Sequence, residues 1–248
     1  MQHRLIARMD IKGKNLIKPI QMEGLRVVGD PRLRATKYYE DGADEIIFLD
    51  AVASLYNRNN LTEILTYAVK NIFVPVTAGG GVRSLQDIES LLQGGADKVA
   101  INTAAVRNPA LIREAARRFG TQCIVLSIQA KRGAKGWECY CDGGREHTGR
   151  DVTEWAREAA DLGAGEILLT SVDREGTRKG FDLELIQTVA DAVSMPVVAS
   201  GGLGNPGDAS LAVAAGASAV AVADMIHFDR ASLSDIKVAN PAIFEVRP

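Results

Sequence analysis

Short runs of β-branched and other apolar residues recur along the chain, and each is followed by a glycine-bearing or polar stretch and then by helical spacing. The runs are continuously apolar rather than alternating, which is typical of parallel strands buried on both faces. We expect strands at residues 5–9, 45–49, 74–77, 98–101, 123–128, 166–170, 197–199 and 219–223. Eight strand–loop–helix units in this length predict one α/β domain over residues 1–248, a single (β/α)8 barrel.

The second half of the sequence repeats the first at an offset of 121 residues, or 119 near the N-terminus. The matching pairs are DGADEIIFLD from Asp41 with LGAGEILLTS from Leu162, VTAGGGVR from Val76 with VVASGGLG from Val197, GADKVAIN from Gly95 with GASAVAVA from Gly216, and ARMDIKGK from Ala7 with LSIQAKRG from Leu126. Because the matches keep the same order, two half-barrels explain them better than a general likeness among strand–helix units.

Composition narrows the class of protein. The 29 Lys and Arg residues balance 31 Asp and Glu residues, and no basic run is present, so a nucleic-acid partner is not expected. No stretch approaches 18 uncharged apolar residues, so a membrane partner is not expected either. The first acid comes at residue 10, too early for a signal peptide. We therefore expect a cytoplasmic protein, without a disulfide framework, given its three cysteines.

Glycine-rich turns follow the third and seventh expected strands. Gly80 and Gly81 lie in the first turn, and Gly201 and Gly202 in the second. Glycine lets backbone N–H groups approach an anion closely, and a following helix adds a favourable dipole. Two such turns at related positions predict two phosphate sites on opposite sides of one mouth, although tight packing alone also favours glycine.

Polar residues stand where the expected strands end, the position at which barrels of this class build their sites. They are Asp10, Asp50, Asn102, Thr103, Gln129, Ser171, Asp173 and Asp224. Asp10 is the best candidate for a general acid or base, because burial in a barrel mouth can tune a carboxylate. The alternative is that it merely binds a loop lysine: Lys12, Lys14 or Lys18.

The internal repeat exposes two departures from symmetry. Gln129 occupies the position that matches Asp10, and an amide carries no titratable proton at ordinary pH. Asp224 matches Thr103, so a carboxylate replaces a hydroxyl suited to a phosphate oxygen. Two like charges about 4 Å apart repel by roughly 4 kcal/mol at an effective dielectric of 20. If Asp224 faces the mouth, the second anion site is weakened.

These residues resemble, over nearly the whole chain, the cyclase subunits of imidazole glycerol phosphate synthases, which take ammonia from a glutaminase in histidine biosynthesis. The matching segments are ARMDIKGKNLIK, GLRVVGDP, DGADEIIFLD, AGGGVRS, GADKVAINTAAV, GGREHTGRDVTEWA, GAGEILLTS with DREGTRKGFD, and ASGGLG. The long loop at residues 11–30 and the GGREHTGRDVTEWA hairpin distinguish the cyclase from the related isomerase. No cofactor and no metal are expected.

The resemblance also implies roles for individual residues. Two aspartates act as acid and base in the family; Asp10 matches one, and Gln129 replaces the other. The implied binding residues for a substrate with two phosphates are Lys18, Asp50, Gly80, Gly81, Asn102, Thr103, Ser171, Gly176, Gly201, Gly202 and Asp224. Asp224 stands where the family has a serine, and Glu175 where it usually has an aspartate.

Charged residues open four of the expected strands. They are Arg4, Glu45, Lys98 and Glu166. Buried charges must pair, and the four resemble the ring that gates the family's ammonia passage; ordinary solvated strand ends are the alternative. Asp97 resembles a family position facing the glutaminase subunit.

Three functions remain open: a cyclase, an ammonia-delivering subunit and, least favoured, an unrelated phosphate-binding role. A true cyclase would keep Asp10 and the first anion turn, but Gln129 argues against full activity. A divergent paralogue would deliver ammonia from a glutaminase to another acceptor, with a sugar amidotransferase in surface-glycan (lipopolysaccharide) pathways; the segment LDAVASLYNRNNL resembles that branch. We favour delivery at this stage.

Cys139, Cys141 and His147 lie in the segment that follows the fifth strand. Two cysteines at C-x-C spacing without further ligands at a known spacing indicate ordinary hairpin residues rather than a metal site.

Overall fold

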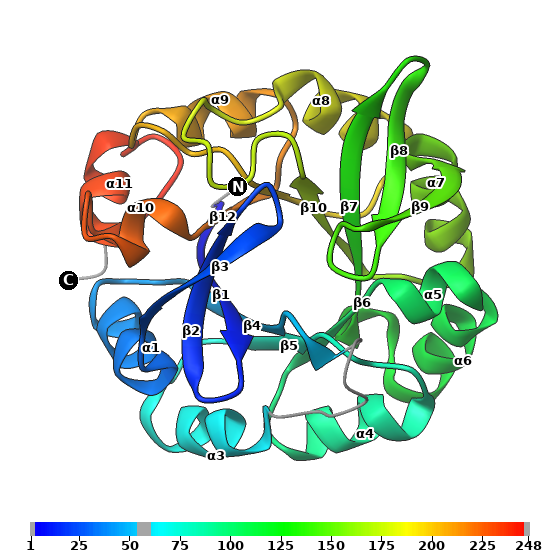
Figure 1. Cartoon of the computed structure of the whole chain (residues 1–248), viewed down its shortest axis with the longest axis horizontal. Helices are drawn as coiled ribbons and strands as arrows, with labels where there is room; N and C mark the ends of the chain where they lie inside the picture. Colours follow the sequence, from blue (N-terminus) through cyan, green and yellow to red (C-terminus); the bar gives the residue numbers. More distant parts are fainter. Residues whose placement is uncertain (1–2, 54–60, 246–248) are drawn as a thin grey trace.

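The parallel strands close into a barrel surrounded by helices (Figure 1), and the computed structural model describes residues 3–53 and 61–245. The barrel strands are β1 (Arg4–Lys12), β4 (Glu45–Asp50), β5 (Val76–Gly79), β6 (Lys98–Ile101), β7 (Ile124–Gly133), β10 (Glu166–Ser171), β11 (Val197–Ser200) and β12 (Ala219–Val222). They pair in the order β10-β11-β12-β1-β4-β5-β6-β7, and parallel pairing of β7 with β10 closes the ring. The predicted (β/α)8 barrel is confirmed.

The helices lie on the outside of the barrel. They are α1 (Pro31–Glu40), α3 (Thr62–Asn71), α4 (Leu85–Gln93), α5 (Thr103–Arg107), α6 (Ala110–Phe119), α7 (Val152–Leu162), α8 (Leu183–Ala192), α9 (Asp208–Ala214), α10 (Asp224–His227) and α11 (Leu233–Ala239), with a 3-10 turn at Thr121–Cys123. Within the described ranges, no helix is both long enough and apolar enough to cross a bilayer.

The third strand begins two residues later than expected. It was predicted at residues 74–77, and β5 runs Val76–Gly79. Proline has no N–H to contribute to a ladder, and Pro75 contributes only its carbonyl, which accepts the N–H of Ile46 at 3.0 Å.

Two antiparallel hairpins extend from the barrel at equivalent places in its two halves. In the first half, β1 continues into β2 (Asn15–Ile20) and β3 (Glu23–Gly29). In the second half, β7 continues into β8 (Gly136–Cys141) and β9 (Glu146–Asp151). Most of the segment at residues 11–30 is therefore strand rather than loop, because β2 pairs with β1 on one side and with β3 on the other.

The core has two parts. The larger lies between the strands and the helices. The smaller fills the barrel interior with the side chains Ile6, Ile47, Ala100, Val125, Leu168, Val198, Ala219 and Ala221. This apolar layer separates the charged residues at the strand starts from the polar residues at the strand ends.

Candidate active site

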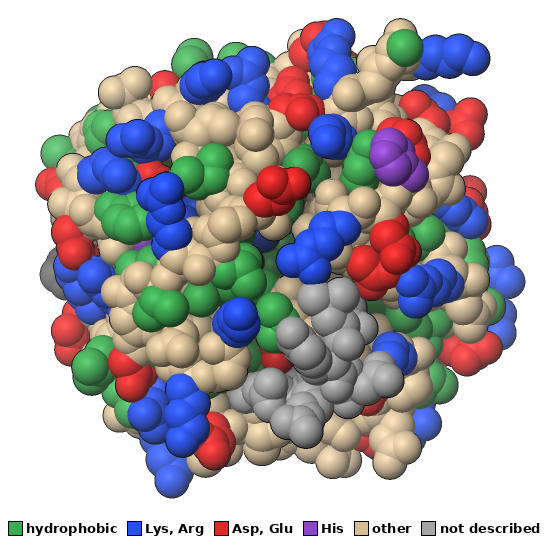
Figure 2. All heavy atoms as spheres, viewed as in Figure 1, with side chains coloured by type: hydrophobic (Ala, Val, Ile, Leu, Met, Phe, Trp, Pro, Cys, Tyr) green, Lys and Arg blue, Asp and Glu red, His purple; other side chains and the backbone are tan. Residues whose placement is uncertain are grey.

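A cavity of about 360 Å³ opens where the barrel strands end. Its wall includes Asp10, Gly80, Gly81, Thr103 and Gln129, which come from four barrel strands and the turns after them. The two hairpins also line it, and they meet there, because a Cβ on Gly144 would lie 2.9 Å from Met22 Cγ. Figure 2 shows basic and acidic side chains around the centre of one face of the molecule.

Asp10 lies near the end of β1 with 3% of its surface exposed. Its Oδ1 accepts hydrogen bonds from Arg8 Nε at 3.3 Å and Arg8 Nη2 at 3.1 Å. Its Oδ2 is buried and has no hydrogen-bond partner in the described part of the chain. The alternative that Asp10 binds a loop lysine is not what the geometry shows, since its hydrogen-bonded partner is an arginine.

Arg8 is one of the site residues that the sequence interpretation missed. It is 3% exposed and forms a buried ion pair with Asp10. The signal was an arginine inside a strand otherwise expected to be apolar, two residues from Asp10 and therefore on the same face of the strand.

Gln129 lies on β7 and lines the same cavity as Asp10. Its Oε1 is buried and accepts no hydrogen bond within the described residues. The cavity thus has a carboxylate on one strand and an amide at the symmetry-related position, as the repeat predicted.

The turn after β5 comes close to neighbouring backbone. Gly80 has φ +91°, and a Cβ there would lie 2.2 Å from Asp50 O. A Cβ on Gly81, at φ +71°, would lie 2.5 Å from Ala53 Cβ. Only glycine fits these positions without displacement. Asp50 Oδ1 accepts the N–H of Val52 at 3.0 Å, which fixes the neighbouring loop.

Two residues after β6 form hydrogen bonds with the second hairpin. Asn102 Nδ2 donates to Tyr140 O at 3.1 Å, and Thr103 Oγ1 accepts the N–H of Asp142 at 3.0 Å. The Thr103 hydroxyl keeps its own proton for another acceptor. At the N-terminus of helix α4, Ser84 and Asp87 form a capping box, so the Asp87 N–H already has an acceptor in Ser84 Oγ.

The second glycine-rich turn faces a much smaller pocket, of about 20 Å³. Gly176, Gly201, Gly202 and Asp224 line it. A Cβ on Gly202, at φ +114°, would lie 2.3 Å from Gly180 O. This volume holds about one water molecule, so an anion needs side chains to move.

Asp224 faces this pocket but is not an isolated charge. Arg230 Nη1 donates to its Oδ1 at 2.7 Å, and Arg178 Nε lies 3.8 Å from the same oxygen. The expected like-charge repulsion is therefore reduced by two arginines, neither of which the sequence interpretation included. Ser171, an expected substrate-binding residue, lines neither this pocket nor the larger cavity. Its Oγ lies 3.5 Å from Asp182 Oδ2.

Lys18 and Glu175 form a buried ion pair beside this pocket. Lys18 reaches it from β2, and Glu175 from the loop after β10. Burial lowers the pKa of the Lys18 ammonium to about 8, while Asp10 raises it and Arg8 lowers it.

The four charged strand starts meet in one ring at the opposite end of the barrel. Arg4 donates to Glu45 and to Glu166. Lys98 Nζ donates to both carboxylates at 2.8 Å. Each carboxylate thus receives two cations, which offsets the cost of its burial. The alternative, that these four residues are ordinary solvated strand ends, does not fit this paired arrangement.

Asp97 is exposed next to this ring, and its Oδ2 accepts the N–H of Val76 at 2.7 Å. The Asp97 carboxylate therefore holds the start of β5 in place, in addition to any role at an interface.

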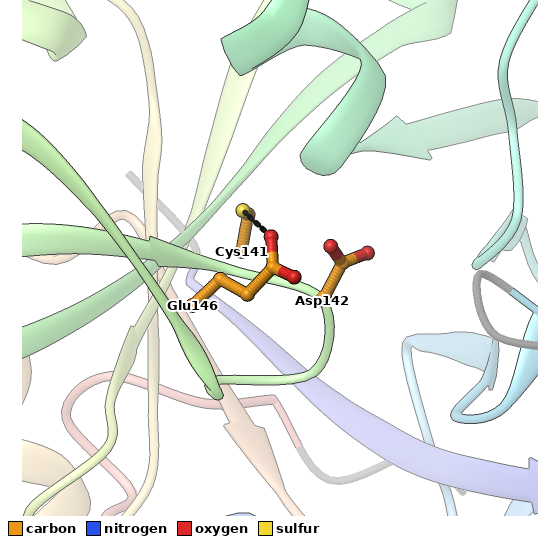
Figure 3. A group of neighbouring side chains, drawn as sticks. All are labelled: Cys141, Asp142 and Glu146. Atoms are coloured by element: carbon orange, nitrogen blue, oxygen red, sulfur yellow. Dashed lines mark hydrogen bonds between the residues drawn. The ribbon is translucent and has the colours of Figure 1, made fainter.

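Cys141, Asp142 and Glu146 lie together at the end of the second hairpin (Figure 3), with ligand atoms within 4.8 Å of one another. Arg107 Nη2 already lies 2.7 Å from Asp142 Oδ2 and 3.3 Å from Glu146 Oε2. A metal ion would have to displace this guanidinium, so the group is better described as an arginine–carboxylate contact.

A closed (β/α)8 barrel with a buried carboxylate between two glycine-rich turns belongs to the class whose sites for small molecules form at the strand ends. The family described as "Histidine biosynthesis protein" matches residues 4–232. The chain belongs to this family, as a HisF-like subunit.

Three relatives share the name "Imidazole glycerol phosphate synthase subunit HisF". The protein from Legionella pneumophila is 64% identical over 202 residues, which are 81% of this chain and 95% of the relative. That from Corynebacterium diphtheriae is 46% identical over 252 residues, 98% of each chain, and that from Thermobifida fusca is 47% identical over 240 residues, 94% of each chain.

These relatives do not support the expected divergent paralogue of surface-glycan pathways, since all three carry the synthase name. The segment LDAVASLYNRNNL, on which that expectation partly rested, lies mostly outside the described residues, at 54–60.

Proposed function

We propose that this chain is the cyclase subunit of an imidazole glycerol phosphate synthase, which uses ammonia to close the imidazole ring on a phosphorylated substrate. The observation that carries the proposal is Asp10, whose Oδ2 is left without a partner at a cavity of about 360 Å³. A positioned carboxylate with one free oxygen can accept a proton from a substrate. The names of the relatives agree with this function.

The substrate's phosphates would bind at the two glycine-rich turns. The larger site is formed by Gly80, Gly81 and the Thr103 hydroxyl. The smaller site, at Gly176, Gly201 and Gly202, requires the Asp224 carboxylate or its arginines to move first.

Ammonia would come from a glutaminase subunit docked on the ring at the strand starts. That ring is closed by ion pairs on both sides of Glu45 and Glu166, so passage through it requires at least one pair to open. Asp97 would lie in the interface with this partner.

Gln129 favours a second candidate function, delivery of ammonia to a sugar acceptor through a sugar amidotransferase. The amide removes one of two expected proton-transfer groups while the charged ring is kept. In this case the barrel passes ammonia on without closing a ring.

Steady-state turnover with an ammonium salt and the family's cyclase substrate separates the two functions, with Asp10→Asn as the matched control. We expect turnover that Asp10→Asn lowers by at least about 100-fold. If the unaltered protein is no faster than Asp10→Asn, the cyclase proposal fails.

A further inference from the structure

Arg8 places a positive charge inside the barrel. Side chains alternate along β1, and Ile6, two residues earlier, belongs to the apolar layer of the interior. Arg8 therefore points inward just above that layer, directly below Asp10. An arginine in such a position is kept only if its donors find partners.

The Arg8 guanidinium reaches far across the barrel. Its Nη1 donates to Thr170 Oγ1 on β10 and to Ser200 Oγ on β11, both at 2.9 Å. Two strands, β12 and β11, separate β1 from β10 in an eight-stranded ring, so the side chain passes close to the barrel axis.

The other side of the guanidinium holds Asp10 through one oxygen only. Nε and Nη2 both donate to Oδ1, whereas a purely structural arginine–carboxylate pair usually engages both oxygens in parallel. Oδ2 is left buried and without a partner among the described residues, on a residue that lines the cavity. A buried acceptor without a donor is costly unless a ligand supplies one.

We propose that Arg8 is a positioning residue that fixes Asp10 through Oδ1 and thereby selects Oδ2 as the oxygen that exchanges a proton with the substrate. The inference rests on the proposed function, in which Asp10 is the proton-transfer group. Arginine suits this task because it keeps its own proton. The anchors on Thr170 and Ser200 prevent the guanidinium from following the carboxylate when a ligand binds.

The test is steady-state cyclase turnover with an ammonium salt for Arg8→Met, Arg8→Lys and Thr170→Val. We expect Arg8→Met to lower kcat about 100-fold or more with KM within about threefold, because an undirected carboxylate still leaves the phosphate turns intact. Arg8→Lys should recover part of this loss, and Thr170→Val, which loosens one anchor, should cost severalfold in kcat. A kcat of Arg8→Met within threefold of the unaltered protein, or a loss confined to KM, overturns the inference.

A second measurement separates this inference from the proposed function. If the unaltered protein shows no turnover, the cyclase proposal fails, and a crystal structure of Arg8→Met then tests the positioning alone. We expect the Asp10 carboxylate to turn away from the orientation that it has beside Arg8. An unchanged Asp10 side chain in that structure overturns the role of Arg8. If Arg8→Met does not fold, the same comparison is made with Arg8→Lys and Thr170→Val.

Discussion

Asp10 and Gln129 occupy equivalent places in the two halves of the barrel, each where its strand leaves the barrel and enters a hairpin. Asp10 pairs with Ile17 of β2, and Gln129 pairs with Tyr140 of β8. Both line the same cavity, and each has a buried oxygen without a hydrogen-bond partner within the described residues. The backbone thus places two equivalent side chains at the cavity. One of them is the carboxylate of Asp10, and the other is the amide of Gln129.

Gln129→Asp should raise cyclase turnover with ammonium by at least about tenfold, because a positioned acid or base contributes roughly 10² to 10⁴-fold. Steady-state kinetics at matched substrate concentrations measures this. Gln129→Asn is the control, since it shortens the side chain equally without adding an ionisable group. Equal rates for the two variants would show that proton transfer at this position does not limit the reaction.

Anion binding should differ between the two glycine-rich turns. A crystal grown in sulfate should show the ion at Gly81 and Thr103 more readily than at Gly202, because the second pocket holds only about 20 Å³ and faces Asp224. Asp224→Ser should tighten phosphate binding there roughly two- to tenfold by freeing Arg230 and removing a like charge. Arg230→Gln is the opposing variant and should weaken it. Equal occupancy of both sites before substitution would contradict the expected difference.

Acid should destabilise the protein through His227. Its Nδ1 lies 2.7 Å from the Tyr38 hydroxyl, and burial lowers the pKa of the imidazole to about 3. Because the unfolded chain titrates near 6.5, the folded state is favoured fully above that pH and loses this contribution as pH falls towards 3. For this group alone, the free energy of unfolding should drop by about 2 kcal/mol between pH 7.5 and 5.

Urea unfolding at the two pH values measures this loss. His227→Gln should remove most of it, whereas His147→Gln, on the exposed hairpin, should leave it in place. A pH dependence that is the same in all three proteins would assign the acid sensitivity to other groups.

Asp97→Lys should weaken association with the glutaminase subunit by about tenfold or more, because it reverses a charge beside the ring. We expect the interface to bury at least roughly 1,200 Å². Titration of the barrel with the partner by calorimetry measures the affinity. Since Asp97 also accepts the Val76 N–H, Asp97→Asn is the control for that contact. Equal affinity of the Lys and Asn variants and the unaltered protein would place the partner elsewhere.

The fold could be predicted because its signals are local. Each barrel strand is a short apolar run, and the glycine turns and Asp10 follow such runs directly, so strand ends and mouth residues could be assigned from spacing alone. The half-barrel repeat added the match between Asp10 and Gln129, because a repeated backbone puts matching positions at equivalent places.

Contacts between distant segments were decided only by the tertiary structure. Arg8 meets Thr170 and Ser200, more than 160 residues away, only because closure of the barrel brings β10 and β11 across from β1. Nothing in a one-dimensional pattern distinguishes these hydroxyls from others in buried strands. Similarly, the charge on Asp224 could be assigned from sequence, but its neutralisation by Arg230 and Arg178 depends on how two loops fold beside each other. The sequence alone determines which ionisable and polar groups the chain carries. The packing of distant segments determines which of these groups become hydrogen-bonded or ion-paired neighbours.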